Sequence, residues 1–320
     1  MSAKTLPILF DEMFQGEYDF EHFLGFSMSN EVVQKIFDNK ITFIASPTLR
    51  AYHRIIRRYV LRSMEINSEV VFSYRKDVNV VDALRKHVES KCFYQTDLFD
   101  FFPSINRDLV KRTLIKNSRN MPFIDFEEYV DRFADLMTFD SFVPRGFSTS
   151  PSLSNACLTE FDNVFLEYCQ ENDLVYTRYS DDIVISGMSD EIVKTGNLAL
   201  VNFLTELYGG IFSINQKKSR FLKVGRKIKI LGMVILPNGS VGIELALKHK
   251  IEMLLHFYST DSFKFLDAVN NDLEKGTQML AGYINFANAA DRNFLEKLRK
   301  KYGTGVIAVS YTHLSCRRRG

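Results

Sequence analysis

The sequence predicts an α+β fold built from two parts of different character. Up to about residue 240, short runs of apolar and β-branched residues alternate with longer stretches in which apolar residues recur every three or four positions. Beyond Glu244 only the helical spacing remains, so this second part is predicted to be all helical. At 320 residues the chain is long enough to form more than one hydrophobic core.

The composition is that of an ordinary globular protein. Hydrophobic residues make up 46% and charged residues 25% of the chain, and the net charge of +2 says little about partners. No run of about eighteen apolar residues predicts a membrane span, and the N-terminus lacks the features of a signal peptide. The four cysteines have neither metal-ligand nor disulfide-framework spacing. We therefore expect a cytoplasmic protein with reduced thiols and no membrane partner.

One strand and one long helix are predicted before residue 65. Residues 1–40 have the pattern of short helices joined by turns, and 41–46 form an apolar strand that ends at Pro47. Residues 48–64 have helical periodicity with an apolar face and an opposite basic face. We expect the basic face to meet an anionic ligand. It carries Arg50, Arg54, Arg57 and Arg58.

Strands and helices then alternate as far as residue 243. A strand is expected over 92–98, followed by a helix to 115 with Asn106 or Asp108 as its N-cap. Asp125 is the predicted cap of a second helix, over 126–137. Strands at 174–179 and 183–186 predict a hairpin. The other expected elements are helices at 150–169 and 190–208, strands at 229–236 and 241–243, and C-terminal helices at 246–258, 262–274, 278–287 and 291–302.

Three acidic residues carry the chemistry that the sequence suggests. Asp181 and Asp182 lie at the predicted hairpin tip, and Asp97 ends another apolar strand. If these strands are neighbours in one sheet, three carboxylates converge and raise one another's pKa values unless a cation compensates. Mg²⁺ prefers such oxygen ligands, and two ions about 4 Å apart can activate an attacking hydroxyl and stabilise a leaving pyrophosphate. The alternative is a polar turn at the hairpin and a helix cap at Asp97.

Basic residues gather apart from these acids. Between residues 217 and 229 the chain has a run of basic residues and no acid. Basic surfaces beside an acidic pocket suit a protein that binds phosphate backbones and carries out metal chemistry between them. The alternative is a solvated charged face. The run consists of Lys217, Lys218, Arg220, Lys223, Arg226, Lys227 and Lys229.

Several segments, in their order along the chain, resemble the palm motifs of reverse transcriptases, and most of all those of the bacterial retron-type enzymes. They are FYQTDLFDFFPSI (93–105), PRGFSTSPSLSN (144–155), TRYSDDIVIS (177–186), INQKKS (214–219) and KILGMVI (229–235). Residues 280–303 are similar to the thumb end of retron polymerases, so the resemblance covers roughly 40–305. It implies a right-hand polymerase with N-terminal helices and fingers at 1–92, a palm at 93–240 with interleaved fingers segments at about 106–142, and a helical thumb at 241–308.

The last residues of the chain have an unusual sequence. Residues 309–314, VSYTHL, resemble the translation of an adapter used in preparing sequencing libraries, and 315–319 resemble its continuation after a one-base slip. The alternative is a genuine basic tail. In the first case the arginines at 317–319 say nothing about nucleic-acid binding.

The resemblance also implies roles for individual residues at the reacting centre. Asp97, Asp181 and Asp182, with the backbone of Leu98, would hold two Mg²⁺ ions, for which Mn²⁺ is a possible substitute. Lys218 would stand near the leaving pyrophosphate and donate a proton to it or balance its charge.

Further implied roles concern the nucleotide and the nucleic acid. The amides of Asp100 and Phe101 would face the incoming triphosphate, the ring of Phe102 would exclude a ribose 2′-hydroxyl, and Arg145 and Gly146 belong to a loop under the nucleotide. The primer would be approached closely by the backbone at Gly232. The complete set of residues expected to bind nucleic acid is Arg50, Arg54, Arg57, Arg58, Lys217 and Gly232.

The chain departs from the retron pattern at three places. Arg145 stands where most family members have glutamine, so its role does not transfer directly. Ile230, Leu231 and Gly232 replace a Val-Thr-Gly sequence. The retron motif Asn-Ala-x-x-His is present only in part, and His87 is expected to be structural.

Three functions remain open at this point. A retron reverse transcriptase would copy a structured non-coding RNA, which also supplies the primer, from deoxynucleoside triphosphates. It would leave an RNA–DNA hybrid product and would act with an effector protein in antiphage defence. Another bacterial reverse transcriptase, of the abortive-infection or diversity-generating type, would use the same chemistry with a different primer. A catalytically silent RNA-binding scaffold would keep only the fold, and the intact aspartates argue against it.

Overall fold

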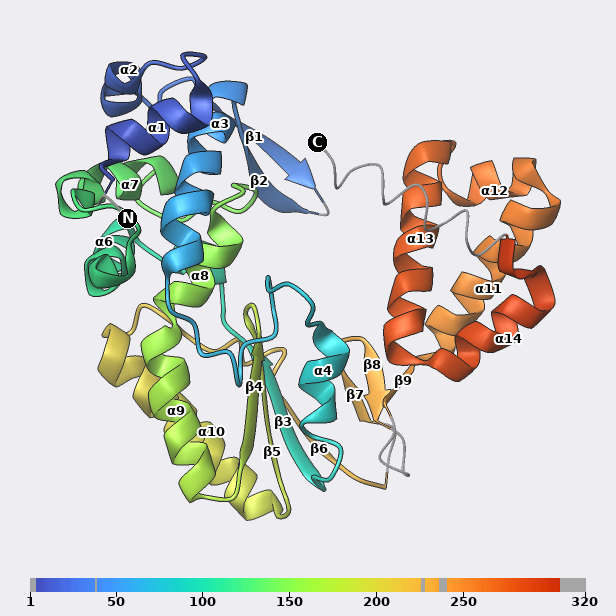
Figure 1. Ribbon diagram of the computed structural model, residues 1–320. Helices are drawn as coiled ribbons and strands as arrows, with labels where there is room; N and C mark the ends of the chain where they lie inside the picture. The colour runs from blue at the N-terminus through green and yellow to red at the C-terminus, as the bar shows by residue number, and fades with distance from the viewer. Residues whose placement is uncertain (1–3, 38, 226–227, 236–240, 306–320) are drawn as a thin grey trace. The chain divides into compact units, whose positions relative to one another are not determined.

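The computed structural model describes residues 4–37, 39–225, 228–235 and 241–305 (Figure 1). The chain divides into two compact units. The first consists of Met1–Asn79 and Ser90–Phe221, and the second of Val80–Glu89 and Leu222–Gly320. Residues 237–240 between two predicted strands, the tail at 309–320 and two members of the basic run, Arg226 and Lys227, lie outside the described residues. The predicted limits of fingers, palm and thumb stay a prediction.

A four-stranded sheet with the order β4-β5-β3-β6 lies at the centre of the first unit. Its strands are β3 (Cys92–Asp97), β4 (Val175–Tyr179), β5 (Asp182–Gly187) and β6 (Arg220–Lys223). β5 runs antiparallel to both β3 and β4. Helices α9 (Thr159–Glu171) and α10 (Asp190–Tyr208) pack along the sheet (Figure 1). β3 and β5 are buried over nearly their whole length, and the apolar residues at the start of β3 and in the middle of β5 made them recognisable.

Helices and one hairpin complete the first unit. β1 (Val32–Phe37) pairs with β2 (Lys40–Ala45) in antiparallel register along its whole length. Aromatic side chains form much of the core of this unit. The rings of Phe23 and Tyr52, for example, meet edge-on with centroids 5.1 Å apart. The helices are α1 (Leu6–Phe14), α2 (Phe20–Gly25), α3 (Pro47–Ile55), α5 (Phe101–Ser104), α6 (Arg107–Lys116), α7 (Val130–Met137) and α8 (Ser150–Cys157), with short 3₁₀ turns at Ser118–Asn120 and Phe126–Tyr129.

The expectation of helices and turns throughout residues 1–40 was wrong, because β1 is a strand. Its side chains are exposed almost without interruption, and they include Val33, Ile36 and Phe37. A strand with neither face buried has no alternation of apolar and polar residues by which to recognise it. Its pairing with β2 depends on the tertiary structure and is not visible in the local sequence.

The predicted helix over 48–64 is present, but its pitch changes along its length. α3 continues into a π-helical turn at Ile56–Val60 and then a 3₁₀ turn at Leu61–Ser63. A π-helical turn contains more residues than an α-helical one, so it rotates the side chains that follow it relative to those before it.

Three other predicted elements differ in the structure. The helix expected over 150–169 is divided at Leu158 into α8 and α9. The helix expected over 126–137 begins as a 3₁₀ turn, and Asp125 does not cap it but accepts a hydrogen bond from the Leu6 amide at 2.9 Å. The strand expected over 229–236 is two strands joined by a turn at Leu231 and Gly232, which both have positive φ. Asn106 caps α6 as predicted.

The second unit combines a small sheet with helices. The sheet has the order β7-β8-β9, from Ile228–Ile230, Met233–Ile235 and Val241–Ile243. The predicted helices appear with shifted ends as α11 (Leu245–Thr260), α12 (Ser262–Ala268), α13 (Leu273–Ala290) and α14 (Arg292–Tyr302), and α4 (Val80–Arg85) joins them. Asp261, Asp272 and Asp291 accept hydrogen bonds from backbone amides at the starts of α12, α13 and α14. No helix in the described ranges is long and apolar enough to cross a membrane.

Candidate active site

Strand register brings the three predicted aspartates to one end of the central sheet. Asp97, the last residue of β3, lies opposite Asp182, the first residue of β5. Asp181 occupies the turn immediately before β5, and its carbonyl accepts a hydrogen bond of 3.0 Å from the amide of Leu98. Residues far apart in the sequence therefore meet at the point where the hairpin of β4 and β5 lies beside β3.

The carboxylates at this end of the sheet are close together and partly shielded from solvent. Asp97 is only 5% exposed; its Oδ2 accepts a hydrogen bond of 2.5 Å from Nζ of Lys218, and its buried Oδ1 has no hydrogen-bond partner among the described residues. Burial, and then the charges of Asp181 and Asp97, raise the pKa of Asp182 to about 7, against the opposing effect of Lys218 and Lys40. The hydrogen bond to Asp97 in turn raises the pKa of Lys218. The effect of Lys218 and Lys40 on the pKa of Asp182 is thus smaller than the combined effect of burial and the neighbouring carboxylates.

The side chains fit a divalent cation in their chemistry but are not arranged as a closed metal site. Within the described residues, no group of three or more His, Cys, Asp or Glu side chains is placed to hold a metal ion. The ammonium of Lys218 supplies the positive charge at Asp97. A cation bound here would nevertheless pair with the unpartnered carboxylate oxygen of Asp97 and lower the raised pKa of Asp182. Carboxylate oxygens are also the ligands that Mg²⁺ prefers.

A cavity of about 460 Å³ opens beside the aspartates. Both acids and cations line it, and Lys40 and Arg145 form no ion pair with another described residue. Aromatic rings complete the wall. The charged lining residues are Asp97, Asp100, Asp181, Lys40, Arg145 and Lys218, and the aromatic ones are Phe43, Phe99, Phe101 and Phe142. Such a lining matches a ligand with an aromatic base and a polyphosphate.

Of the two adjacent phenylalanines, Phe101 belongs to the core. Its residue is 2% exposed, and its ring centroid lies 6.1 Å from that of Phe212. Phe102 is half-buried and packs at 5.4 Å against Phe101. Phe101 lines the cavity, whereas Phe102 is not among the lining residues. The predicted role of Phe102 in sugar selection therefore stays a prediction. Asp100 just before them adopts a left-handed conformation, with φ of +41°.

The loop that carries Arg145 and Gly146 is docked against β2. The amide of Phe43 donates a hydrogen bond of 2.7 Å to the carbonyl of Arg145. Gly146 has φ of +107°, and a Cβ at this position would lie 2.5 Å from the carbonyl oxygen of Phe43. Only glycine permits both this backbone conformation and this close approach. Gly146 thus places Arg145 at the cavity without lining it.

Comparison with known proteins agrees with this arrangement. The profile of the family described as "Reverse transcriptase (RNA-dependent DNA polymerase)" matches residues 39–235, which include both strands that carry the aspartates. The chain belongs to the reverse transcriptase family. The α+β right-hand polymerase fold expected from the sequence is confirmed, and so is the assignment as an RNA-directed DNA polymerase, a nucleotidyltransferase.

Curated relatives of this reverse transcriptase include retron enzymes. It is 23% identical to the Retron Ec83 reverse transcriptase of Escherichia coli, over 82% of this chain and 83% of the relative. It is 27% identical to the Retron Ec73 reverse transcriptase of Escherichia coli, over 76% of each. The resemblance to retron-type enzymes is thereby confirmed. A solved structure of telomerase from Candida albicans with a fragment of telomeric RNA matches at 10% identity and a TM-score of 0.48, covering 95% of this chain and 65% of that one, which adds nothing to the assignment.

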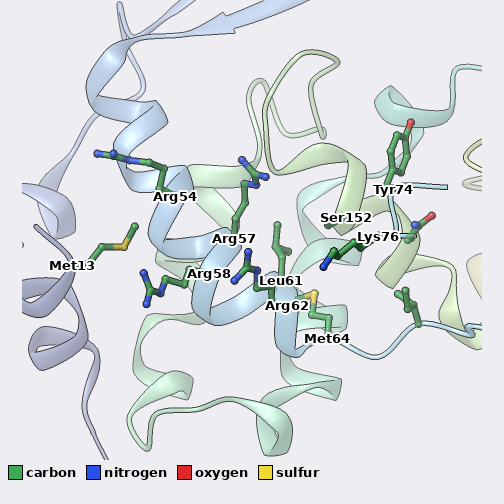
Figure 2. Close-up of a pocket in the computed structure, with 12 residues that line it drawn as sticks. Met13, Arg54, Arg57, Arg58, Leu61, Arg62, Met64, Tyr74, Lys76 and Ser152 are labelled. Atoms are coloured by element: carbon green, nitrogen blue, oxygen red, sulfur yellow. The ribbon is translucent and has the colours of Figure 1, made fainter. Parts of the chain in front are cut away.

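A second cavity in the first unit of the reverse transcriptase is strongly basic. It has a volume of about 730 Å³ and is lined by Arg54, Arg57 and Arg58 (Figure 2). Arg62 and Lys76 line it too, although we did not predict them. No acid is among the described lining residues. Arg62 was detectable, because it lies four positions after Arg58 on the same helical face, whereas the approach of Lys76 depends on the tertiary fold.

The remaining predicted nucleic-acid residues lie elsewhere. Arg50 is exposed and does not line the basic cavity, although Arg54, four positions later in the same helix α3, does; the predicted role of Arg50 in nucleic-acid binding stays a prediction. Lys217 is exposed next to Lys218. Gly232 belongs to the second unit, in the turn between β7 and β8, with φ of +77° and open space around its Cα.

Proposed function

We propose that this reverse transcriptase copies a structured non-coding partner RNA into single-stranded DNA, with Asp97, Asp181 and Asp182 holding two Mg²⁺ ions. The observation that carries the proposal is the register of Asp97 opposite Asp182, with Asp181 beside them. Two divalent cations held by such a triad activate an attacking hydroxyl and stabilise a leaving pyrophosphate. The backbone of Leu98 joins the ligands in this proposal.

The protein's own cations bind and orient the deoxynucleoside triphosphate. Lys40 and Arg145 face the cavity without ion-pair partners in the described part of the chain, so both are available for phosphate oxygens. Lys218 balances the charge of the leaving pyrophosphate or donates a proton to it. Asp100 and Phe101, which line the same cavity, direct their amides to the triphosphate, and Phe102 limits the space at the sugar.

The basic cavity, together with Arg50, Lys217 and Gly232, binds the nucleic acid. Its cations suit a phosphodiester backbone, because each phosphate that they neutralise releases counterions. Template and growing strand form an RNA–DNA hybrid product. The names of the curated relatives support a retron system, in which the RNA also supplies the primer and an effector protein completes an antiphage defence. The buried free thiols of Cys92, Cys157 and Cys169 suit a reducing cytoplasm.

Primer extension on a homopolymer RNA template with Mg²⁺ tests the proposed chemistry. The Asp181→Asn variant loses a metal ligand but no basic surface, so extension is expected to vanish while RNA affinity stays. Asp11→Asn, at an exposed carboxylate of α1, is the matched control and should keep full activity. Full extension by Asp181→Asn, or loss of its RNA binding alone, would contradict the assignment.

A further inference from the structure

Ser180, the residue that precedes the two aspartates of the hairpin, has an unusual backbone. Its φ is +62°, in the left-handed region that non-glycine residues seldom adopt, and it is only 6% exposed. A residue keeps such a conformation only where its surroundings impose it. The adjacent Asp181 and Asp182 take their direction from this turn, so whatever holds Ser180 also orients their carboxylates.

Every polar group of Ser180 is bound by a residue outside the turn tip. Its amide donates to Oγ of Ser73 at 2.8 Å. Its carbonyl accepts from Nη1 of Arg178 at 3.1 Å, and its hydroxyl lies 2.9 Å from the hydroxyl of Tyr74. Ser73 and Tyr74 come from a segment that is hydrogen-bonded to β4, where the amide of Phe72 donates to the carbonyl of Arg178 at 3.0 Å. The turn is therefore held from the side opposite to Asp97.

Behind the turn lies a fully buried ion pair. The guanidinium of Arg178 donates through Nε to Oδ1 of Asp162 at 2.8 Å and through Nη2 to Oδ2 at 2.5 Å, and neither side chain is exposed. Tyr176 donates its hydroxyl to the same carboxylate at 2.7 Å. Burial tends to lower the pKa of Arg178, but the charge of Asp162 and the hydrogen bonds to it outweigh this and raise the pKa. Arg178 stays charged.

Asn155 joins the ion pair to the segment that holds Ser180. Its side-chain oxygen accepts from Nη1 of Arg178 at 3.1 Å and from the hydroxyl of Ser73 at 3.2 Å, and its amide donates to the Ser73 carbonyl at 2.9 Å. One continuous set of hydrogen bonds thus leads from α9 through α8 to the turn. A buried ion pair contributes little net stability compared with apolar packing of the same volume. Here the ion pair fixes one geometry for the side chains that are hydrogen-bonded to it.

We propose that Ser73, Tyr74, Asn155, Asp162 and Arg178 form a positioning network that holds Ser180 in its left-handed conformation and so orients Asp181 and Asp182. The proposal rests on the catalytic role proposed above for these aspartates. None of the five touches the reacting atoms. Two of them, Asn155 and Tyr74, also line the basic cavity, and Figure 2 shows Tyr74 there, so the network extends from that cavity to the catalytic turn.

Two single variants test the network by steady-state extension on a homopolymer RNA template. Ser73→Ala removes the acceptor of the Ser180 amide, and Tyr74→Phe removes the partner of the Ser180 hydroxyl. Tyr74 is 47% exposed, so its loss does not endanger folding. We expect kcat to fall by about tenfold for Ser73→Ala and severalfold for Tyr74→Phe, because small misplacement of reacting groups is costly. The Mg²⁺ concentration for half-maximal rate should rise, while the KM for the nucleotide stays in both variants and the RNA affinity stays in Ser73→Ala, which does not alter the basic cavity.

A double variant shows whether Tyr74 acts through Ser180. Ser180→Ala and Tyr74→Phe remove the same hydrogen bond, so the double variant is expected to be no slower than the slower single variant. Additive losses would overturn the proposal for Tyr74. Ser186→Ala is the matched control, because this serine is also fully buried in β5 and hydrogen-bonded, to Ser90, but at the opposite end of the strand. It should leave kcat and the Mg²⁺ requirement unchanged.

The outcomes separate this inference from the proposed function. If Asp181→Asn is inactive but folded Ser73→Ala and Tyr74→Phe keep wild-type kcat and Mg²⁺ requirement, the network has no positioning role and the catalytic assignment survives. An equal loss in Ser186→Ala would also overturn the network, since any buried serine of the sheet would then matter. If Asp181→Asn remains active, the catalytic assignment itself fails.

Discussion

Nζ of Lys218 lies 2.5 Å from Oδ2 of Asp97, although 121 positions separate the two residues in the sequence. The side chain of Lys218 is 62% exposed and that of Asp97 only 7%, so an exposed cation pairs with a buried anion at the cavity. Backbone hydrogen bonds hold the two segments together: the amide of Asn215 donates to the carbonyl of Asp97 at 2.9 Å. A long side chain anchored this way can leave Asp97 for a phosphate without moving its own backbone.

Replacing Lys218 by alanine is expected to lower kcat for primer extension by about 10²-fold, the scale on which positioned proton donors act. The affinity for RNA should change little, because one exposed cation of many is removed. Lys91→Ala, at the opposite end of β3, is the control. Unchanged kcat in Lys218→Ala would remove this lysine from the reaction.

The pKa of Asp182 predicts how pH controls metal binding. In the folded protein this pKa is raised from 3.8 to about 7, so the neutral form is favoured. Its contribution to the free energy of unfolding is therefore complete below pH 3.8 and is lost as the pH rises through 7. Mg²⁺ requires the ionised carboxylate, so the stabilisation by Mg²⁺ in thermal melts should grow as the pH rises from about one unit below this pKa to about one unit above it.

Asp182→Asn is the control for this pH dependence, since it has no carboxyl group to ionise at this position. In the wild type without metal, the melting temperature should fall between the two pKa values, 3.8 and about 7, more than in Asp182→Asn. Equal pH profiles of the two proteins, with and without Mg²⁺, would show that Asp182 ionises in its ordinary range.

Phe101 and Phe102 are expected to respond differently to truncation. Phe102→Ala should admit ribonucleotides, measured as the ratio of kcat/KM for a deoxynucleotide to that for the matching ribonucleotide, because it enlarges the space near the sugar. Phe101→Ala instead removes a buried ring and should destabilise the protein by about 3–5 kcal/mol in denaturant unfolding. Altered sugar selectivity in a folded Phe101→Ala variant, with none in Phe102→Ala, would assign the selection to Phe101.

The basic cavity predicts a salt-dependent RNA affinity. In the double variant Arg57→Ala/Arg58→Ala, the slope of log affinity against log salt should become shallower by about 0.7 for each phosphate that the protein no longer neutralises. Arg50→Ala should have a smaller effect, because Arg50 lies outside the cavity. Arg119→Ala, at an exposed arginine of a 3₁₀ turn, provides the baseline. Equal slopes in all of these proteins would exclude the cavity as a phosphate-binding surface.

For some residues, the local sequence pattern is enough to predict the element in which they lie. The strands around Asp181 and Asp182 and the run ending at Asp97 were predicted, because their apolar and β-branched residues are largely buried in the sheet. The helices of the second unit were predicted for a similar reason, since their spacing reflects one buried face. β1 was missed, because exposure of Val33, Ile36 and Phe37 leaves no such pattern.

The sequence by itself determined the three aspartates, the strands that carry them and the order of motifs that marks a reverse transcriptase. Only the tertiary structure decided that Asp97 and Asp182 face each other, that Lys218 reaches Asp97, that Arg50 does not line the basic cavity, and that Arg178 is buried behind the turn. The physical reason is that periodicity reports which face of one element is buried. Register, pitch changes and long-range hydrogen bonds depend on which other element lies against that face.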